Sequence, residues 1–187
     1  MSKDNKNDDY NTHLESVFDR QFNKKDRIIV ISDEITTDTF IFVDAALTEL
    51  EKVNNKDITI KIHSKGGNTY DAGAIIGRIL ECPCRIITKG YGQVMSSAIM
   101  ILAVGDHRQM TKYSWAMWHE CSFENSGRLS DHKATLQQTE IEENLWAKLM
   151  ANHSSKSLKF WKSNGITSDM YLTPEQLLKY KVIDEVL

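Results

Sequence analysis

The first half of the chain alternates between short apolar runs and longer amphipathic segments. The apolar runs predict strands over Arg27–Ser32, Ile58–Ile62 and Arg85–Thr88. Apolar residues spaced three and four apart predict helices over Thr37–Val53 and Thr69–Leu80. Strands and helices in this alternating order are typical of a layered α/β fold.

The second half begins with the apolar run Ala98–Val104, which is too short to span a bilayer and suits a buried helix. A Gly-flanked turn precedes it. A long amphipathic helix is expected from about Ser130 to His153, where Ile141, Leu145 and Leu149 recur every fourth residue. This spacing predicts that the helix buries one of its faces.

A helix start is also visible near the end of the chain. Thr173 supplies an N-cap hydroxyl, Pro174 suits the first turn, and Gln176 completes a capping pattern. The chain then ends in a strand-like run, Lys181–Asp184. Asp169 lies just ahead of the helix, where the loop is held in place.

Ser96 stands at the predicted start of the buried helix. There, unpaired backbone N–H groups and the positive end of the helix dipole favour a developing oxyanion, as acyl transfer requires. Ser96 is therefore a candidate nucleophile. The simpler interpretation is that Ser96 only caps the helix, because serine is a common N-cap residue.

Two further features accompany Ser96. The strand ending at His63 runs into Gly66-Gly67, where glycine allows backbone conformations that other residues avoid and can direct an N–H towards a substrate oxygen. A lone histidine, His119, ends the apolar run Trp115–Trp118 and is a candidate base for Ser96. The glycine pair could also be an ordinary turn, and His119 an ordinary half-buried histidine.

Four blocks of the chain resemble the proteolytic subunit of Clp proteases, within the wider group that shares the crotonase-like spiral fold. They occur in the family's order, and the likeness extends from about Arg27 to Leu187. The blocks are Ile62–Gly67, Gly92–Ser96, Trp115–Glu120 and Ser168–Glu175. The resemblance implies an α/β fold of repeated ββα units in a spiral, with a projecting strand-helix handle that includes the long helix.

The resemblance also implies a role for each candidate residue. Ser96 would attack the scissile carbonyl, His119 would take and return the proton, and Asp169 would orient His119. The backbone N–H groups of Gly67 and Ser97 would form the oxyanion hole. The order Ser–His–Asp along the chain differs from that of α/β-hydrolases, chymotrypsin-like and subtilisin-like enzymes, and no Gly-x-Ser-x-Gly motif is present.

The implied function is that of a serine endopeptidase. It would hydrolyse peptides or unfolded proteins through an acyl-enzyme inside a ring-shaped chamber, formed by a heptamer or a tetradecamer of identical subunits, with an AAA+ ATPase unfoldase as partner. The chain departs from the family pattern at Thr59 and Lys61, where aromatic residues often form the ATPase docking pocket. It also has Lys65 in place of proline, and Ser97-Ala98 in place of Met-Gly.

Two alternatives remain open at this point. The chain could be a catalytically inert ring scaffold or regulatory homologue whose triad is misaligned. It could also be a crotonase-like enzyme that acts on an acyl-coenzyme A, although such an enzyme would not need Ser96, His119 and Asp169 together. In either case Asp169 could be an ordinary turn or capping residue.

Composition narrows the remaining choices. With 187 residues, 41% of them hydrophobic, the chain predicts one domain over residues 25–187, and a net charge of -3 gives no case for nucleic-acid binding. Residues 1–24 are predicted to be a mobile segment, because they begin with a polar run that fits neither a signal peptide nor a membrane anchor. A cytoplasmic location is expected.

Cysteine usage agrees with a reducing compartment. Cys82 and Cys84 lack the Cys-x-x-Cys spacing, and Cys121 has no evident partner. No second pair of ligands at zinc-like spacing is present, so neither a metal nor a cofactor is expected.

Overall fold

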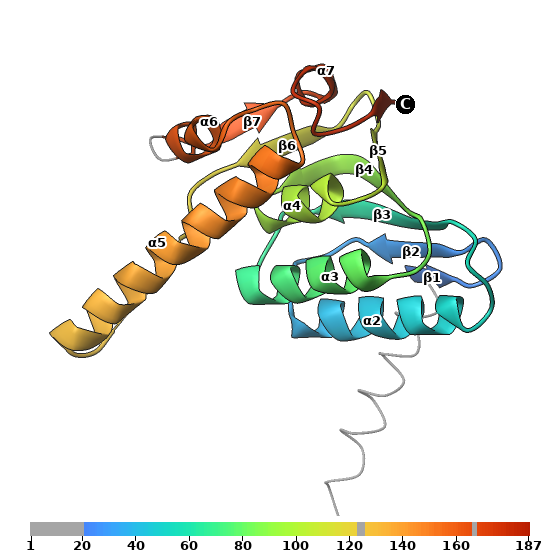
Figure 1. Cartoon of the computed structure of the whole chain (residues 1–187), viewed down its shortest axis with the longest axis horizontal. Coiled ribbons are helices and arrows are strands. Elements are labelled where there is room, and N and C mark those ends of the chain that lie inside the picture. Colours follow the sequence, from blue (N-terminus) through green and yellow to red (C-terminus); the bar gives the residue numbers. More distant parts are fainter. Residues whose placement is uncertain (1–20, 123–125, 166–167) are drawn as a thin grey trace, which may run out of the picture.

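The computed structural model of the chain describes residues 21–122, 126–165 and 168–187. Its centre is a twisted, mostly parallel β-sheet (Figure 1). The strands are β1 (Phe22–Asn23), β2 (Ile28–Ile31), β3 (Ile58–Ser64), β4 (Ile86–Met95), β5 (His107–Met110), β6 (Trp115–Trp118), β7 (Met170–Leu172) and β8 (Glu185–Val186). The helices are α2 (Thr37–Glu51), α3 (Thr69–Glu81), α4 (Ser97–Ala103), α5 (Leu129–Asn152), α6 (Leu158–Ser163) and α7 (Pro174–Lys179).

Strand β4 is the branching point of the sheet. The order of the main sheet is β1-β2-β3-β4-β5-β8, in which β2 to β5 and β8 are parallel and β1 is antiparallel to β2. The first part of β4 pairs with β5, whereas its last residues, Gln93–Met95, pair in parallel with β6. β6 in turn pairs antiparallel with β7. The end of β4 therefore leaves the main sheet and carries the chain towards β6 and β7.

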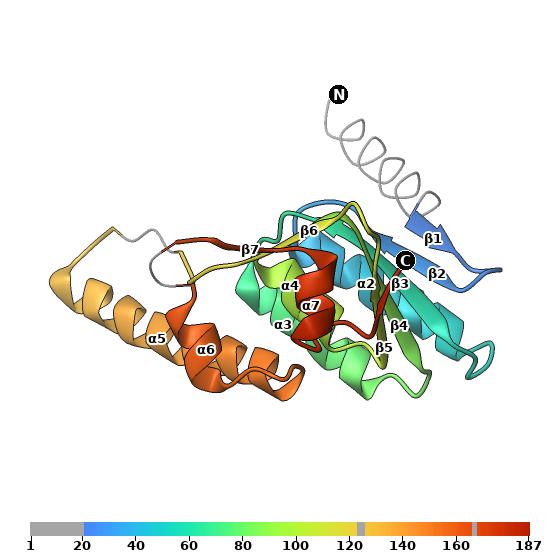
Figure 2. The same ribbon diagram turned by 90° about the horizontal axis from the view of Figure 1, so that it is seen from above.

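The hydrophobic core lies between the sheet and the helices. α2 and α3 lie side by side on one face of the sheet, and α4 is buried against α3 and β4 (Figures 1 and 2). Each large aliphatic side chain removed from water stabilises the fold by roughly 1.5–3 kcal/mol. The fully buried members of this core include Ile29, Leu47, Ile60, Ile62, Ile75, Ile99 and Ile101.

Side-chain caps fix where α2 and α3 begin. Thr36 and Thr39 form a reciprocal capping box at the start of α2. The Asn68 side chain accepts hydrogen bonds from the backbone N–H groups of Tyr70 and Asp71 at the start of α3. Because Asn68 directly follows Gly67, this cap also anchors the glycine pair.

The structure confirms the predicted order of strands and helices up to α4, with ends that differ by a few residues. Two predictions are wrong. The predicted Gly-flanked turn after Thr88 is instead an irregularity within β4, which continues to Met95: its register with β3 shifts between Ile62 and Ser64, and Gly92 has φ of 55°. The run Lys181–Asp184 is not a strand: Lys181 has φ of 58°, and the last strand, β8, begins at Glu185.

Helix α5 extends well beyond the body of the molecule (Figures 1 and 2). Only its C-terminal part packs on the core, through Trp146, Ala147 and Met150. Of the predicted buried stripe, Leu149 is half-buried, whereas Ile141 and Leu145 are 62% and 54% exposed. The buried residues Trp146, Ala147 and Met150 lie on a different face of α5, so the predicted buried stripe is wrong for Ile141 and Leu145 as they stand in a single chain.

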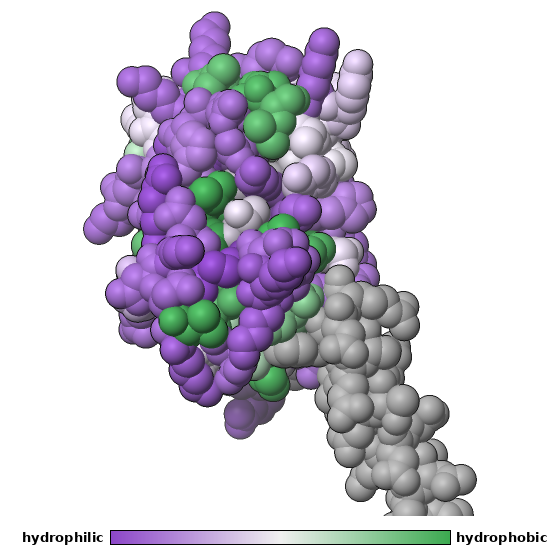
Figure 3. All heavy atoms as spheres, turned by 90° about the vertical axis from the view of Figure 1, so that its right-hand side faces the viewer, coloured by the Kyte–Doolittle hydropathy of each residue, from purple (hydrophilic) through white to green (hydrophobic). Residues whose placement is uncertain are grey.

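The opposite end of the molecule has a different surface. Figure 3 shows that the face on the right of Figure 1 is mostly hydrophilic, with small separate hydrophobic patches. The outer part of α5 projects on the other side (Figure 1).

Most of the predicted mobile segment, residues 1–20, lies outside the described residues. The remainder of that segment includes β1, whose Phe22 and Asn23 pair with Ile29 and Ile28. Among the helices of the described ranges, none has the length and apolar character needed to cross a membrane.

Candidate active site

Ser96 occupies a sharp turn between β4 and α4. Its backbone has φ of 53° and ψ of -128°, a combination that costs a non-glycine residue of order 1–3 kcal/mol. Its N–H donates to the Met117 carbonyl at 2.8 Å, which holds the turn against β6. The hydroxyl makes no cap hydrogen bond to α4, so the interpretation of Ser96 as a helix cap is wrong.

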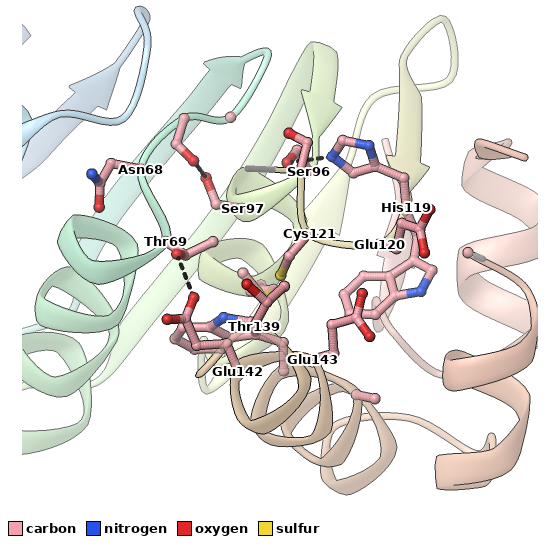
Figure 4. Close-up of a pocket in the computed structure, with 18 of the residues that line it drawn as sticks. Asn68, Thr69, Ser96, Ser97, His119, Glu120, Cys121, Thr139, Glu142 and Glu143 are labelled. Carbon is pink, nitrogen blue, oxygen red and sulfur yellow. Dashed lines mark hydrogen bonds between the residues drawn. The ribbon is translucent and has the colours of Figure 1, made fainter. Parts of the chain in front are cut away.

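His119 reaches Ser96 because their strands are paired. In the parallel register of β4 and β6, Met95 lies opposite Met117, so the residues after both strands emerge at the same edge. His119 Nε2 lies 2.8 Å from Ser96 Oγ, within hydrogen-bond distance (Figure 4). A neutral imidazole with Nε2 unprotonated accepts this hydrogen bond from the hydroxyl, as a general base must.

The backbone around His119 is held by α6 and the residues after it. The Trp118 indole N–H donates to the Trp161 carbonyl at 2.9 Å, and Glu120 N–H donates to the Gly165 carbonyl at 3.1 Å. A Cβ on Gly165 would lie 2.9 Å from Trp118 Nε1, so only glycine allows this close approach. These contacts fix the end of β6 and limit how far His119 can move.

Asp169 lies on the other side of His119. It precedes β7, and the antiparallel register of Trp118 opposite Met170 brings it beside the histidine. Its Oδ1 lies 3.7 Å from His119 Nδ1, which is ion-pair distance but longer than a hydrogen bond. The side chains of His119 and Asp169 are 28% and 48% exposed. The structure therefore brings all three candidate residues together, with the second contact looser than the first.

The Gly66-Gly67 segment lies directly against the Ser96 turn. A Cβ on Gly66, whose φ is 94°, would lie 2.6 Å from both the Met95 carbonyl oxygen and the Ser96 Cβ. A Cβ on Gly67 would lie 2.3 Å from the Ile35 carbonyl oxygen. The turn is therefore more than a simple connection, because both positions require glycine for close backbone approach.

Two backbone N–H groups remain available beside Ser96. The Ser97 hydroxyl donates to the Gly67 carbonyl at 3.3 Å, which ties the two segments together. Among the residues that the structure describes, no protein acceptor takes the N–H of Gly67 or that of Ser97. The N–H of Ser97 is free because it belongs to the first turn of α4.

Ser96 and His119 open into a groove of about 820 Å³ (Figure 4). One wall is the start of α3, including Thr69, and the opposite wall is α5. The end of β6 and the buried Met100 of α4 close it from behind. Lys65, whose ammonium pairs with Glu34 at 3.0 Å, also lines it, which places a charge in the groove where the family pattern has proline. A groove of this size accommodates several residues of an extended peptide.

Glu142 of α5 bridges the two walls. Its carboxylate accepts hydrogen bonds from the Tyr70 hydroxyl, from Thr69 Oγ1 at 3.2 Å and from Gln138 Nε2 at 3.2 Å (Figure 4). The hydrogen bond to Glu142 raises the pKa of Tyr70. Sequence reasoning missed Glu142, because a contact between residues more than seventy positions apart leaves no local signal in one sequence.

The cysteine nearest the site is held as a thiol. Burial, together with the negative charges of Glu143, Glu142 and Glu120, raises the pKa of Cys121 to about 11. Cys82, Cys84 and Cys121 are all free.

The sequence of the chain is also similar to sequences of known proteins. The family model described as Clp protease matches residues 11–187. The chain belongs to the Clp protease family. Clp protease family members are peptidases, and the resemblance of the four sequence blocks is thereby confirmed.

Individual relatives carry the same description. The chain is 30% identical over 169 residues to the ATP-dependent Clp protease proteolytic subunit 1 of Prochlorococcus marinus, covering 87% of this chain and 84% of the relative. It is 28% identical over 167 residues to the ATP-dependent Clp protease proteolytic subunit of Bacteroides fragilis, covering 87% and 79%. The corresponding subunit of Porphyromonas gingivalis is 25% identical over 166 residues.

Proposed function

We propose that this chain is a serine endopeptidase that hydrolyses peptides or unfolded proteins through an acyl-enzyme at Ser96. The observation that carries the proposal is the 2.8 Å contact between Ser96 Oγ and His119 Nε2, made by a serine that does not cap its helix. A serine hydroxyl is a weak nucleophile until a neighbouring base accepts its proton. Membership of the Clp protease family supports the same reaction.

In the proposed mechanism, the Ser96 proton moves to His119 Nε2 as Oγ bonds to the scissile carbonyl carbon. The oxygen of the resulting tetrahedral intermediate accepts hydrogen bonds from the N–H groups of Gly67 and Ser97. Removal of one such donor lowers kcat by a factor of about 10²–10³. His119 then protonates the leaving amine, the C–N bond breaks, and water hydrolyses the acyl-enzyme by the reverse sequence of proton transfers.

Asp169 acts in this proposal on the far side of the imidazole. A carboxylate beside Nδ1 keeps the proton on that nitrogen and stabilises the imidazolium that forms during attack. The 3.7 Å separation must shorten for a direct hydrogen bond, as happens in many hydrolases when substrate binds. The exposure of Asp169 leaves its side chain room for that movement.

We also propose that the chain assembles into a ring, a heptamer or a tetradecamer, in which the repeated ββα units form a spiral head and α5 forms part of a handle. Support comes from the exposed apolar side chains of α5, because a long helix with uncovered leucine and isoleucine is stabilised by a partner surface. A cytoplasmic location is proposed with it, which the free thiols support.

An AAA+ ATPase is the partner that the names of the ATP-dependent relatives suggest. Docking on the sheet face of β3 would meet a polar surface in this chain. Thr59 and Lys61 are half-buried there, and the Lys61 ammonium lies 6.0 Å from the centre of the Tyr91 ring. The proposed contact with such a partner therefore includes polar interactions.

A second candidate function is a catalytically inert ring scaffold. It is favoured by one observation, the absence of a hydrogen bond between His119 and Asp169 at 3.7 Å. Labelling with a fluorophosphonate reagent distinguishes the two, because only an activated serine reacts. We expect labelling of the unmodified protein and of Cys121→Ala, and none of Ser96→Ala or His119→Ala. Failure of the unmodified protein to label, together with no peptide cleavage, would favour the scaffold.

A further inference from the structure

The groove beside Ser96 carries an excess of acidic side chains. Its charged lining residues are Glu34, Glu120, Glu142, Glu143, Lys65 and Lys162. Lys65 is paired with Glu34, and the Lys162 ammonium donates to Asn144 Oδ1 at 2.7 Å. Beyond the Glu34–Lys65 pair, three carboxylates face one ammonium, so the inner part of the groove is negative. Burial, followed by the charges of these carboxylates, raises the pKa of the Cys121 thiol.

The carboxylates of this groove differ in how many hydrogen bonds and ion pairs they make. Glu142 already accepts hydrogen bonds from Thr69, Tyr70 and Gln138. Among the described residues, Glu120 and Glu143 have neither an ion pair nor a side-chain hydrogen bond. Glu143 is half-buried and lines the groove, and its carboxylate is without such a partner (Figure 4). A charge in that condition favours a cationic ligand.

A second observation in the same groove also indicates a ligand. Trp146 follows Glu143 by one helical turn on α5 and lines the groove, yet its side chain is only 7% exposed. Its indole N–H has no hydrogen-bond partner in the described part of the chain. Buried N–H groups are rarely left unpaired. A peptide in the groove supplies backbone carbonyl oxygens, which are the acceptors that this donor lacks.

We propose that this groove binds a lysyl or arginyl side chain of the peptide substrate, with Glu143 as the specificity-determining residue and Trp146 as a donor to the peptide backbone. The proposal rests on the proposed peptidase function and specifies its substrate class. The long aliphatic stem of lysine or arginine passes the apolar walls, including Met100, while the cationic end reaches the unpaired carboxylate. Glu120, at the end of β6, adds to the same negative field.

The test uses peptides that are identical except at the residue that supplies the scissile carbonyl. That residue is lysine, acetyl-lysine, norleucine or glutamate. Acetyl-lysine keeps the stem of lysine and removes its charge. We expect kcat/KM to be about tenfold higher for lysine than for acetyl-lysine, and lowest for glutamate. The lysine preference should shrink at high salt, because screening weakens an attraction in an open groove.

Two matched variants assign the effect to a residue. Glu143→Gln should reduce the ratio of kcat/KM for lysine over acetyl-lysine several-fold, because only the charged lysine loses an oppositely charged partner. Glu140→Gln removes the same charge from an exposed position on α5 that does not line the groove, and should leave the ratio unchanged. Equal effects of the two substitutions would overturn the assignment of Glu143.

The failures of the two proposals are distinguishable. Cleavage of the norleucine peptide without any preference for lysine would overturn the specificity proposal and leave the peptidase proposal intact. No cleavage of any peptide, combined with no fluorophosphonate labelling of Ser96, would overturn both. Preference for lysine that survives in Glu143→Gln would show that another group recognises the cation.

Discussion

Gly66 lies so close to Ser96 that a Cβ added to the glycine would be 2.6 Å from the serine Cβ. The strand end that carries Gly67 and the turn that carries Ser96 are therefore in direct contact. This contact makes the spacing between the candidate nucleophile and the N–H of Gly67 a property of two packed backbones. Side-chain rotation cannot change it, so the site is pre-organised in the sense that oxyanion stabilisation requires.

Substitution of Gly66 tests that contact. Gly66→Ala places a methyl group against the Met95 carbonyl and Ser96, at a φ of 94° that alanine avoids. We expect a loss of stability of about 1–3 kcal/mol and loss of fluorophosphonate labelling. The control is Gly77→Ala in α3, where nothing lies within 4 Å of the added Cβ, and it should stabilise by about 0.5–1 kcal/mol. Normal labelling of Gly66→Ala, measured beside thermal unfolding, would contradict the contact.

The strained backbone of Ser96 predicts that glycine at this position gives a more stable protein than alanine. Ser96→Ala and Ser96→Gly both remove the hydroxyl and should both abolish labelling and peptide cleavage. Only glycine tolerates φ of 53° without strain, so Ser96→Gly should be more stable than Ser96→Ala by about 1 kcal/mol. Thermal unfolding of the two variants measures the difference. Equal stability would mean that the Ser96 turn stores no strain.

Some parts of this site are predictable from one sequence and others are not. Ser96 and His119 are predictable, because Ser96 precedes a recognisable apolar run, His119 follows one, and the family motifs include both residues. The path of β4 is not predictable in this way. Gly90 and Gly92 predict a turn, but Gly92 lies inside β4. Glycine is needed there because a Cβ would be 2.6 Å from His63 Nδ1. The requirement for glycine came from a neighbouring strand, which local sequence does not reveal.

The two walls of the groove show the same limit. The periodicity of α5 predicts a helix with an apolar face, yet it cannot show that Trp146 meets the core while Ile141 points to solvent. The difference is between faces of the helix, because Leu145 is exposed immediately before the buried Trp146. The same holds for the bridge from Glu142 to Thr69, which depends on how α3 and α5 meet in space.

Asp169 provides a direct test of the loosest contact in the site. Asp169→Asn removes the charge beside His119 Nδ1 and keeps the shape of the side chain. If Asp169 orients His119, kcat should fall by about 10²–10⁴ with a smaller change in KM. Steady-state kinetics on a single fluorogenic peptide measure both constants. Glu140→Gln serves as the matched control, and a change in kcat below threefold would remove Asp169 from the proposed mechanism.

The pKa of Cys121 depends on burial and on the acidic side chains of the groove, so it can be tested without a catalytic assay. Its pKa is raised from 9.0 to about 11, so at pH 8 its reactive thiolate is about a hundredfold scarcer than that of an ordinary thiol. Alkylation by iodoacetamide, followed at this residue by mass spectrometry, should be correspondingly slow. Glu143→Gln removes one of the charges that raise the pKa and should therefore speed alkylation. An unchanged rate in Glu143→Gln would place this carboxylate too far from the thiol to matter.

Trp146→Phe separates the indole ring from its unpaired N–H. Phenylalanine keeps most of the buried apolar surface and removes a buried donor that has no acceptor in the described structure. The cost of the unpaired group, about 1–3 kcal/mol, should offset the loss of packing, so thermal stability should change little. If Trp146 donates to the peptide backbone, kcat/KM should fall by a similar factor for all the peptides of the series. A large loss of stability would instead indicate that the ring fills a space that phenylalanine leaves empty.

The exposed stripe on α5 predicts how the proposed ring is held together. Ile141 and Leu145 are 62% and 54% exposed, so the described part of the chain leaves this face of α5 largely uncovered. Ile141→Glu puts a charge in a surface that an assembled ring would bury, where an unpaired charge is strongly destabilising. Light scattering should then show a smaller species, with the far-ultraviolet circular dichroism of the folded chain retained. Glu140→Lys changes the charge at an exposed α5 position on another face of the helix and should leave the assembly unchanged. An Ile141→Glu protein that keeps the size of the unmodified assembly would exclude this face of α5 from the subunit contacts.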